Sequence, residues 1–247
     1  MQEHDLPPSR GRVQVVDAGL QDYGACWDLQ HRLVEARRAG QVPDTLLLVE
    51  HPPTYTIGRN GHWSNLLVND AFLQRVGATR YDVDRGGDIT FHGPGQVVGY
   101  VIMDLGHAER RVRRFVDRIE RTIIDAVAAF GLEAGVDPAH PGVWLGRNKI
   151  AAIGVAISRR ITYHGFALNV ATDLRYFDYM IPCGIPDRGA TSIARELGRP
   201  VARAGAIPPL LDAFARAFEV EIETGITLDD LLRDITPLGA AGTDRRA

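Results

Sequence analysis

Lysine is almost absent from this chain of 247 residues, which contains 28 lysine and arginine residues together but a single lysine, Lys149. Arginine stays charged in proteins, whereas a lysine amine changes its protonation state readily when buried and can act as a base. A chain that uses arginine at every other basic position is therefore expected to need an amine at Lys149. An arginine-rich composition that left one lysine by chance is the alternative, and this observation alone leaves both open.

Cysteine is scarce as well, with only Cys26 and Cys183. Two cysteines exclude a disulfide framework and a cysteine-rich zinc site, and they favour a reducing, cytoplasmic environment. Cys26 falls at helical spacing within a predicted helix, as a buried structural cysteine does. Cys183 lies in the sequence Ile-Pro-Cys-Gly-Ile-Pro, whose two prolines and glycine predict a turn that presents the thiol to a ligand.

Long apolar runs are also missing. No segment approaches the ~20 apolar residues that span a membrane, and the polar first residues do not resemble a secretory signal. The net charge of −3 gives no electrostatic footprint for nucleic acid. We therefore expect neither a membrane nor a nucleic-acid partner. We predict one domain over residues 12–237, between a flexible leader (1–11) and a flexible tail (238–247).

The hydrophobic pattern predicts strands in groups, with helices inserted between the groups. Strands are expected over 13–16, 45–50, 54–57, 79–84, 89–91, 97–103, 149–158 and 161–169, and helices over 22–38, 112–130, 208–218 and 228–235. Strand and helix do not alternate regularly. This order favours an α+β domain with a mixed, largely antiparallel sheet flanked by helices.

A glycine-rich segment at 85–96 (Arg-Gly-Gly-Asp-Ile-Thr-Phe-His-Gly-Pro-Gly-Gln) is a candidate binding site. Its glycines would let backbone N–H groups approach a ligand closely, and Arg85, Thr90, His92 and Gln96 add side-chain donors. The segment is not a P-loop, because no Gly-Lys-Ser/Thr follows, and not a dinucleotide fingerprint, because no helix opens after the glycines. An ordinary glycine-rich hairpin is the alternative.

A second candidate is the sequence His-Gly-Phe-Ala-Leu-Asn at 164–169, which carries small residues within a predicted strand. Gly165 and Ala167 would leave room beside the chain for a ligand, whereas His164 on its own is more typical of a satisfied sheet histidine. Cys183, His92 and His164 together have the ligand types of a zinc site. These residues lack the short paired spacing of such sites, so we predict no metal.

Arginines also gather at the start of the long predicted helix, between Arg110 and Arg121. Val112, Phe115 and Ile119 form the apolar stripe of that helix, and the arginines flank it. A solvated face is the usual explanation. Docking of an acidic protein is the functional alternative, and it would make binding depend on salt.

Lys149 has the chemistry needed to help the Cys183 thiol ionise. A cysteine thiol has a pKa of about 8.5 and is mostly protonated at neutral pH unless a base or a cation assists it. Lys149 would assist either as an ammonium that stabilises the thiolate or as a desolvated, neutral amine that takes the proton. The sequence leaves both roles open.

Together these segments resemble the octanoyl-[acyl carrier protein]:protein N-octanoyltransferase family, also called lipoyl or octanoyl transferases. The resemblance rests on four motifs in order, at 85–96, at 149–154 (Lys-Ile-Ala-Ala-Ile-Gly), at 164–169 and at 173–184, followed by Thr-Ser at 191–192. It covers about residues 46–197. The resemblance implies the fold of the biotin and lipoate protein ligases, and a cytoplasmic enzyme of lipoate synthesis.

The resemblance also implies a catalytic dyad, in which Cys183 is the acyl-thioester nucleophile and Lys149 lowers the pKa of that cysteine. The residues that it assigns to the acyl site are Arg85, Gly86, Gly87, Asp88, Ile89, Thr90, Phe91, His92, Ala152, Ile153, Gly154, Gly165, Phe166 and Ala167, with Gln96 and His164 in support. The implied reaction moves octanoyl from octanoyl-acyl carrier protein to lipoyl domains of 2-oxoacid dehydrogenase complexes and to the glycine cleavage H protein. No cofactor is implied.

Three alternatives stay open. An ATP-dependent lipoate-protein ligase on the same fold would form an acyl-adenylate and would not depend on Cys183. A non-enzymatic regulator would bind the carrier protein or a lipoyl domain without transferring anything. A cysteine hydrolase would release free octanoate and would need no amine acceptor.

Overall fold

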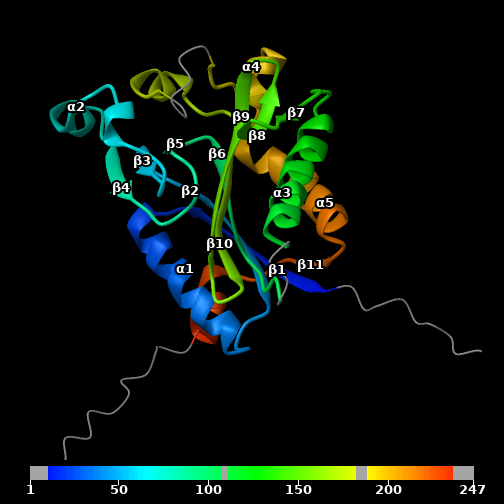
Figure 1. The fold of residues 1–247 in the computed structure, drawn as a ribbon. Helices are drawn as coiled ribbons and strands as arrows, with labels where there is room; N and C mark the ends of the chain where they lie inside the picture. Colours follow the sequence, from blue (N-terminus) through cyan, green and yellow to red (C-terminus); the bar gives the residue numbers. More distant parts are fainter. Residues whose placement is uncertain (1–10, 107–110, 182–187, 236–247) are drawn as a thin grey trace, which may run out of the picture.

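The computed structural model describes residues 11–106, 111–181 and 188–235. Its main sheet is built from β1 (Arg12–Leu20), β2 (Asp44–Glu50), β6 (Gln96–Ile102), β7 (Gly135–Asp137), β8 (His140–Leu145), β9 (Asn148–Ser158), β10 (Ile161–Asn169) and β11 (Glu221–Glu223). The strands follow the order β11-β1-β2-β6-β10-β9-β8-β7 (Figure 1). β1 pairs in parallel with β2 and β11, and the other neighbours pair antiparallel. The predicted fold class, with a mixed and largely antiparallel sheet, is confirmed.

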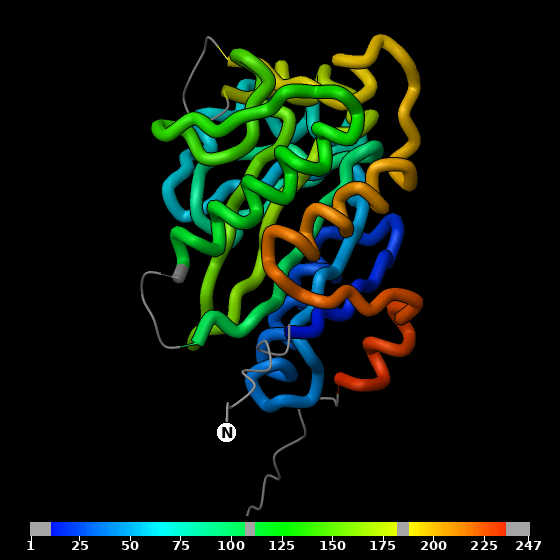
Figure 2. Tube along the Cα trace, turned by 90° about the vertical axis from the view of Figure 1, so that its right-hand side faces the viewer, coloured from blue at the N-terminus to red at the C-terminus, as the bar shows by residue number. Residues whose placement is uncertain are grey.

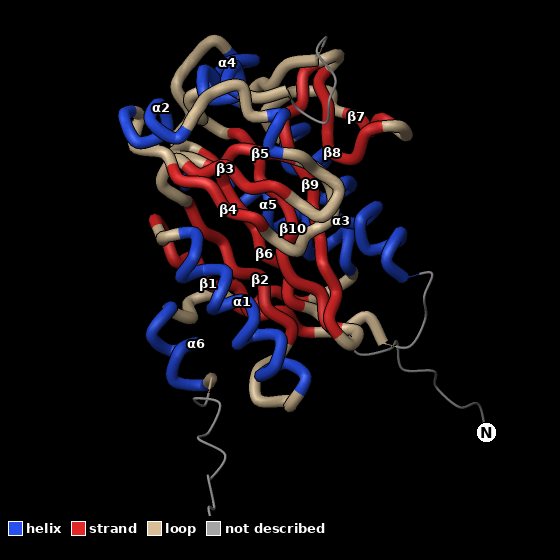
Figure 3. The backbone as a smooth tube through the Cα atoms, turned by 60° about the vertical axis from the view of Figure 1, so that its left-hand side comes forward, coloured by secondary structure: helices blue, strands red, loops and turns tan. Residues whose placement is uncertain are grey.

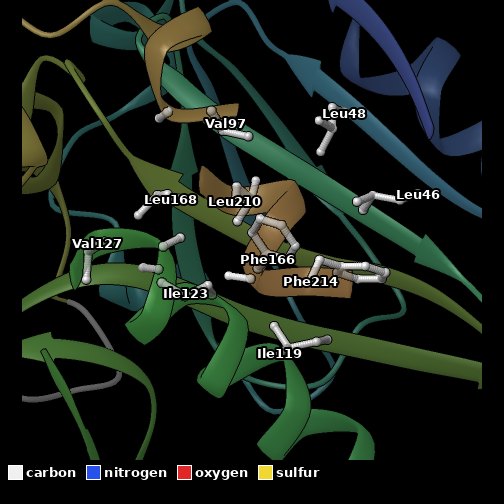
Figure 4. Packing of buried hydrophobic residues seen from close by; sticks show 14 of the residues in the cluster. Leu46, Leu48, Val97, Ile119, Ile123, Val127, Phe166, Leu168, Leu210 and Phe214 are labelled. Carbon is white, nitrogen blue, oxygen red and sulfur yellow. The ribbon is translucent and has the colours of Figure 1, made fainter. Parts of the chain in front are cut away.

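Helices cover both faces of this sheet. α1 (Tyr23–Arg38) and α6 (Leu228–Asp234) lie on one face, and α3 (Arg111–Ala128) and α5 (Arg203–Phe218) lie side by side on the other (Figure 2). Successive residues of a strand point to opposite faces. Phe166 of β10 therefore packs with Ile123 of α3 and Phe214 of α5 (Figure 4), whereas its neighbour Ala167 packs in the cluster beneath α1.

A small sheet of β3 (Thr54–Ile57), β4 (Thr79–Asp82) and β5 (Ile89–His92) lies near the start of α1 (Figure 3). Short helical segments accompany it, namely η1 (Trp63–Asn65), α2 (Asp70–Arg75) and η2 (Leu174–Tyr179). Tyr55 and Phe91 centre a separate apolar cluster under this sheet. The glycine-rich segment begins in the loop between β4 and β5, so the small sheet carries the first candidate site.

The local sequence pattern predicted most of the helices and strands close to their observed positions. The strands predicted over 54–57 and 161–169 have the observed bounds, and α1 begins where Asp22 caps it by accepting a hydrogen bond from the N–H of Ala25 at 2.9 Å. The helix predicted from 208 was wrong at its start, because α5 begins at Arg203 and contains Pro208 and Pro209 in its interior. The hairpin of β7 and β8, the helices α2 and α4 (Ile193–Leu197), and β11 were not predicted.

The arginines of α3 that the structure describes are largely paired on their own surface. Arg113 and Arg121 form ion pairs with Asp117 and Asp125, each one turn further along the helix. Arg118 lies 3.4 Å from a carboxylate oxygen of Glu219. These contacts are typical of a solvated helix face. Arg110, the first of the predicted cluster, lies outside the described residues.

The predicted leader and tail lie almost entirely outside the described residues as well, so both stay predictions. Among the residues that the structure describes, no helix combines the length and the apolar character needed to cross a membrane.

Candidate active site

A cavity of about 100 Å³ lies between the main sheet, the start of α1 and the small sheet. The cavity is bordered by Tyr23, Arg85, Gly87, Asp88, Ile89, Thr90, His92, Gln96, Val98, Tyr100, Pro141, Lys149, Ala152, Ile153, Gly154, His164, Gly165, Phe166, Ala167, Asn169, Phe177, Met180, Gly189 and Ala190. Residues from all four sequence motifs, Lys149 among them, therefore meet around one space.

Four small residues form the floor of the cavity on the two longest strands. Gly165 and Ala167 of β10 lie directly opposite Gly154 and Ala152 of β9 in the antiparallel register. These positions share the sheet face that α1 covers, because Ala167 belongs to the cluster beneath α1. Larger side chains here would fill the space, so the sequence of small residues keeps the cavity open.

Two of these glycines are required by close backbone approach. A Cβ at Gly165 would lie 2.1 Å from the carbonyl oxygen of Gly99 on β6, and a Cβ at Gly154 would lie 2.9 Å from the carbonyl oxygen of Gly86. The backbone N–H of Gly86 donates to the carbonyl of Val155 at 2.9 Å. The glycine-rich loop is thereby fastened directly onto β9.

Arg85 anchors the same loop to the small sheet. Its buried guanidinium donates from Nη2 to the carbonyl oxygen and to the hydroxyl of Thr56, each at 2.8 Å, and from Nη1 to the carbonyl oxygen of Gly86 at 3.0 Å. Arg85 therefore places a permanent positive charge beside the cavity while it holds the loop in position.

His92 faces the cavity as a neutral ring. Its ring stacks on Tyr23 with a centroid separation of 5.5 Å, and its Nε2 lies 3.4 Å from the hydroxyl of Thr56. Burial lowers the pKa of His92 well below its ordinary value, and the neighbouring His51 and Arg85 add to the effect. His92 therefore contributes an uncharged polar edge.

His164 combines a strained backbone with a satisfied side chain. Its φ of 56° lies in the left-handed region, which is rare for a residue with a side chain. Its backbone N–H donates to Oε1 of Gln30 at 2.8 Å, and its Nε2 lies 2.9 Å from Asp84, which also accepts from the hydroxyl of Tyr163. Burial lowers the pKa of His164 even beside Asp84. His164 is thus hydrogen-bonded as a sheet histidine and also borders the cavity.

A chain of hydrogen bonds runs from the glycine-rich segment to Lys149. Gln96 donates from Nε2 to Oδ1 of Asn169 at 2.9 Å, and Asn169 donates from Nδ2 to the carbonyl of Thr191 at 3.0 Å. The N–H of Thr191 donates to the carbonyl of Lys149 at 3.0 Å, and the N–H of Lys149 donates to the carbonyl of Gly189 at 2.9 Å. These bonds fix the backbone of the single lysine at the cavity.

Cys183 falls in the segment 182–187, outside the described residues, so its predicted role as nucleophile stays a prediction. The described residues on both sides of that segment border the cavity, with Phe177 and Met180 before it and Gly189 and Ala190 after it. In the sequence, Cys183 follows Met180 by three positions, with only Ile181 and Pro182 between them.

Most of the other predicted site residues border the cavity, and two do not. Gly86 packs against β9, and Phe91 stacks on Tyr176 in the small-sheet cluster with ring centroids 4.6 Å apart. Sequence reasoning missed Tyr23, Tyr100 and Asn169. Tyr23 and Tyr100 lie in a helix and a strand whose apolar pattern gives no sign of a ligand, whereas Asn169 closes a motif that was already singled out.

The described residues contain no group of three or more His, Cys, Asp or Glu that is arranged to hold a metal ion. A zinc site that includes Cys183 involves a residue outside the described part. His92 and His164, the other two proposed ligands, direct their Nε2 atoms at Thr56 and Asp84.

Comparison with known proteins agrees with this architecture. The model of the lipoyl protein ligase A/B catalytic domain matches residues 22–215. The chain is 46% identical to the octanoyltransferase of Solibacter usitatus (strain Ellin6076), over 85% of this chain and 94% of that protein. It is 48% identical to the octanoyltransferase of Rubrobacter xylanophilus, over 79% of this chain and 89% of that protein.

Solved structures extend the likeness to the fold. A bi-partite lipoate protein ligase from Thermoplasma acidophilum has a TM-score of 0.69 at 14% identity, covering 92% of this chain and 90% of that chain. A lipoate-protein ligase A bound with ATP also has a TM-score of 0.69 at 14% identity, with the same coverage of this chain. At this identity the two structures show the shared fold alone. The chain therefore belongs to the family of the lipoyl protein ligase A/B catalytic domain, and the two relatives named above, at 46% and 48% identity, are octanoyltransferases.

Proposed function

We propose that this chain is an octanoyltransferase, which moves an octanoyl group from a thioester donor to the lysine ε-amine of a lipoyl domain. The relatives at 46% and 48% identity support the acyltransferase activity, because they cover most of this chain and most of their own length. The structural observation that supports the proposal is that all four motifs, with Lys149 among their residues, border one cavity that has a floor of small residues.

In the proposed mechanism, Cys183 is the nucleophile. Its thiolate attacks the carbonyl carbon of the donor thioester, the bond from that carbon to the donor sulfur breaks, and the released thiolate takes a proton. The octanoyl group is then held as a thioester on Cys183. The neutral amine of the acceptor lysine attacks that thioester, an amide forms, and the Cys183 thiolate is released. Two half-reactions of this kind give ping-pong kinetics.

Lys149 assists both half-reactions from the edge of the cavity. As an ammonium it stabilises the Cys183 thiolate and gives a proton to the leaving sulfur of the donor. The neutral amine that remains then takes the proton that the acceptor amine loses when the amide forms, so Lys149 returns to its starting state. Its fixed backbone supports this role, because the hydrogen bonds to Gly189 and Thr191 hold β9 against the chain that follows Cys183.

The acyl chain is proposed to lie over the floor of Ala152, Gly154, Gly165 and Ala167. An octanoyl group has roughly six methylenes, each worth about 0.8 kcal/mol when buried, so the pocket supplies roughly 5 kcal/mol of binding free energy. We expect a graded preference around eight carbons, because one methylene changes specificity by about 10–200-fold.

The sequence resemblance supports a proposal for the particular donor and acceptor proteins. The donor is octanoyl-acyl carrier protein, and the acceptors are lipoyl domains of 2-oxoacid dehydrogenase complexes and the glycine cleavage H protein. The reaction takes place in the cytoplasm and needs neither ATP nor a cofactor, because conversion of a thioester to an amide is downhill.

The ATP-dependent ligase is the second candidate, because two ligases share the fold. Intact-protein mass spectrometry after mixing with octanoyl-acyl carrier protein, without acceptor or ATP, separates the two. The transferase gains an octanoyl mass that maps to Cys183 and is discharged by an apo lipoyl domain. A wild-type protein that gains no such mass, and forms product only from octanoate and ATP, would contradict the proposal.

A further inference from the structure

The single lysine lies against the face of a tryptophan. Lys149 and Trp144 are register partners across β9 and β8, and Nζ of Lys149 is 4.7 Å from the centroid of the Trp144 ring. Trp144 is 6% exposed, and its indole N–H donates to the carbonyl of His140 at 3.0 Å. This hydrogen bond and the burial of the ring hold Trp144 in place within the β7–β8 hairpin.

A second cation contacts the same ring. The Cζ atom of Arg188 lies 4.8 Å from the Trp144 centroid, and its guanidinium forms an ion pair with Asp137 of β7. The pKa of Asp137 is lowered, first by the N–H of Ala139 and then by Arg188, so this carboxylate stays charged. Arg188 is the first described residue after the segment 182–187 that contains Cys183.

We propose that Trp144 is a positioning residue for the acyl transfer, which holds the amine of Lys149 on its ring face and ties the chain after Cys183 to the same ring through Arg188. This inference rests on the proposed function, because it assumes that Lys149 serves Cys183. Trp144 touches neither substrate nor thioester in this proposal and acts through Lys149.

The physical reason is the flexibility and charge of lysine. A lysine side chain has many rotamers, so a contact with its amine narrows the range of positions that the amine occupies. The face of an indole attracts an ammonium and offers nothing comparable to a neutral amine. Trp144 therefore holds the ammonium group of Lys149 on its ring face, from which the positive charge can stabilise a thiolate.

The backbone near Lys149 restricts the positions that its side chain can take. Gly142 has a φ of 126°, and a Cβ there would lie 3.3 Å from Cε of Lys149 and 2.7 Å from the carbonyl oxygen of Ala151. The register of β8 and β9 shifts next to this point, between Val143 and Trp144. A glycine in this conformation lets the lysine stem run along the hairpin to the ring.

The charged and titratable groups around the ring come from the β7–β8 hairpin and from two loops. Asp137 and His140 belong to the β7–β8 hairpin, Glu133 precedes that hairpin, and Arg188 follows Cys183 along the chain. Asp137 is paired with Arg188, so it offsets the guanidinium rather than Lys149. Because Asp137 offsets the charge of Arg188, the cations of Lys149 and Arg188 can both contact the Trp144 ring.

Trp144→Leu, which removes the ring face, tests the proposal. Single-turnover octanoylation of Cys183 should slow by roughly tenfold, with the KM for octanoyl-acyl carrier protein within twofold of wild type. Alkylation of Cys183 by iodoacetamide, mapped by peptide mass to separate it from Cys26, should slow at neutral pH by a similar factor. Trp144→Phe keeps a ring face but loses the indole N–H, and should stay within about threefold of wild type.

Trp63→Leu is a matched control. Trp63 also carries a cation–π contact, with Arg80 at 5.0 Å, and its indole N–H donates to Asp82 at 2.9 Å, but it does not border the cavity. This variant should leave the alkylation of Cys183 unchanged. Trp144→Met, which is flexible and apolar, replaces Trp144→Leu if thermal denaturation shows that the leucine variant is not folded.

A Lys149→Met background separates positioning from structure. There Trp144→Leu should change the alkylation of Cys183 by less than twofold, because no amine remains to be positioned. A tenfold loss in that background as well, or no loss in the wild-type background, would overturn the proposal. Failure of the function itself gives a different result, since wild-type protein would then gain no octanoyl mass on Cys183 while the alkylation series still reports on Trp144.

Discussion

The side-chain amide of Asn169 donates from Nδ2 to the carbonyl oxygen of Thr191 at 3.0 Å, and both residues are buried. The same amide accepts a hydrogen bond from Gln96 at its Oδ1. One side chain at the end of β10 therefore joins the glycine-rich segment to the backbone beside Lys149. A residue outside the proposed pair of Cys183 and Lys149 can in this way determine where the proposed catalytic amine lies.

Asn169→Leu should destabilise the fold and slow octanoyl transfer. The substitution leaves the carbonyl of Thr191 buried without its partner, which costs about 1–3 kcal/mol. Urea denaturation measures the loss, and the octanoylation rate should fall in parallel. Asn69→Ala is a suitable control, because it removes only the N-terminal cap of α2 at an exposed position. That control should cost about 1 kcal/mol and leave the octanoylation rate unchanged.

Ala167→Val should shift the preference to shorter acyl chains. The added methyl groups project from the cavity floor opposite Ala152, so the discrimination between octanoyl and hexanoyl donors should fall by roughly tenfold. Leu168→Ala, on the opposite face of β10 and away from the cavity, should lower stability while leaving the chain-length preference as it is. The ratio of kcat/KM for the two donors decides the question, and an unchanged ratio in Ala167→Val would place the acyl chain elsewhere.

Arg85→Lys should lower stability by about 2 kcal/mol, although it keeps the charge. Lysine cannot reproduce the paired hydrogen bonds to Thr56 and the bond to Gly86 from one planar group. The measurement is the free energy of unfolding, compared with Arg80→Lys. Arg80 is half-exposed and paired with Asp70, so the same exchange there should cost less than about 0.5 kcal/mol. Equal losses at the two positions would contradict the anchoring role of Arg85.

Stability should fall as the pH is lowered from neutral, in part because of His51. Burial lowers the pKa of His51 to about 4, although its hydrogen bond to the carbonyl of Gln21 works in the opposite direction. The unfolded chain has an ordinary histidine pKa of about 6.5, so below that pH the unfolded state binds a proton that the folded state does not. The contribution of His51 to the free energy of unfolding is therefore fully present above pH 6.5 and is lost progressively as the pH falls to about 4.

At pH 5, His51 should lower the free energy of unfolding by about 2 kcal/mol relative to its value above pH 6.5. Each pH unit below the unfolded-state pKa of about 6.5 is worth about 1.4 kcal/mol. His51→Gln removes the titrating group, so urea denaturation at pH 7.5 and pH 5.0 should show a smaller pH dependence in the variant than in wild type. Some dependence should persist, because burial lowers the pKa of His92 and of His164 in the same direction. The same dependence in variant and wild type would mean that His51 does not titrate differently on folding.

Much of the fold and of the candidate site was predictable from local sequence. Alternating and continuous apolar runs predicted β10 and β3 to their observed bounds, and Asp22 marked the start of α1. The clustering of glycines at 85–96 and of small residues at 164–167 predicted segments with room for a ligand, and residues of both segments border the cavity. Such signals are local, because steric demands on glycine and the period of a strand act over a few residues.

The remaining features were decided only by the tertiary structure. The parallel pairing of β1 with β2 and β11 joins segments far apart in the chain, and the short β7–β8 hairpin has too few residues to show a period. Pro208 suggested a helix start, yet α5 begins at Arg203 because packing against α3 outweighs the hydrogen bonds that two interior prolines cannot make. The contact of Lys149 with Trp144 depends on the register of β8 and β9. No local pattern contains that register, because it follows from which strands the whole chain brings together.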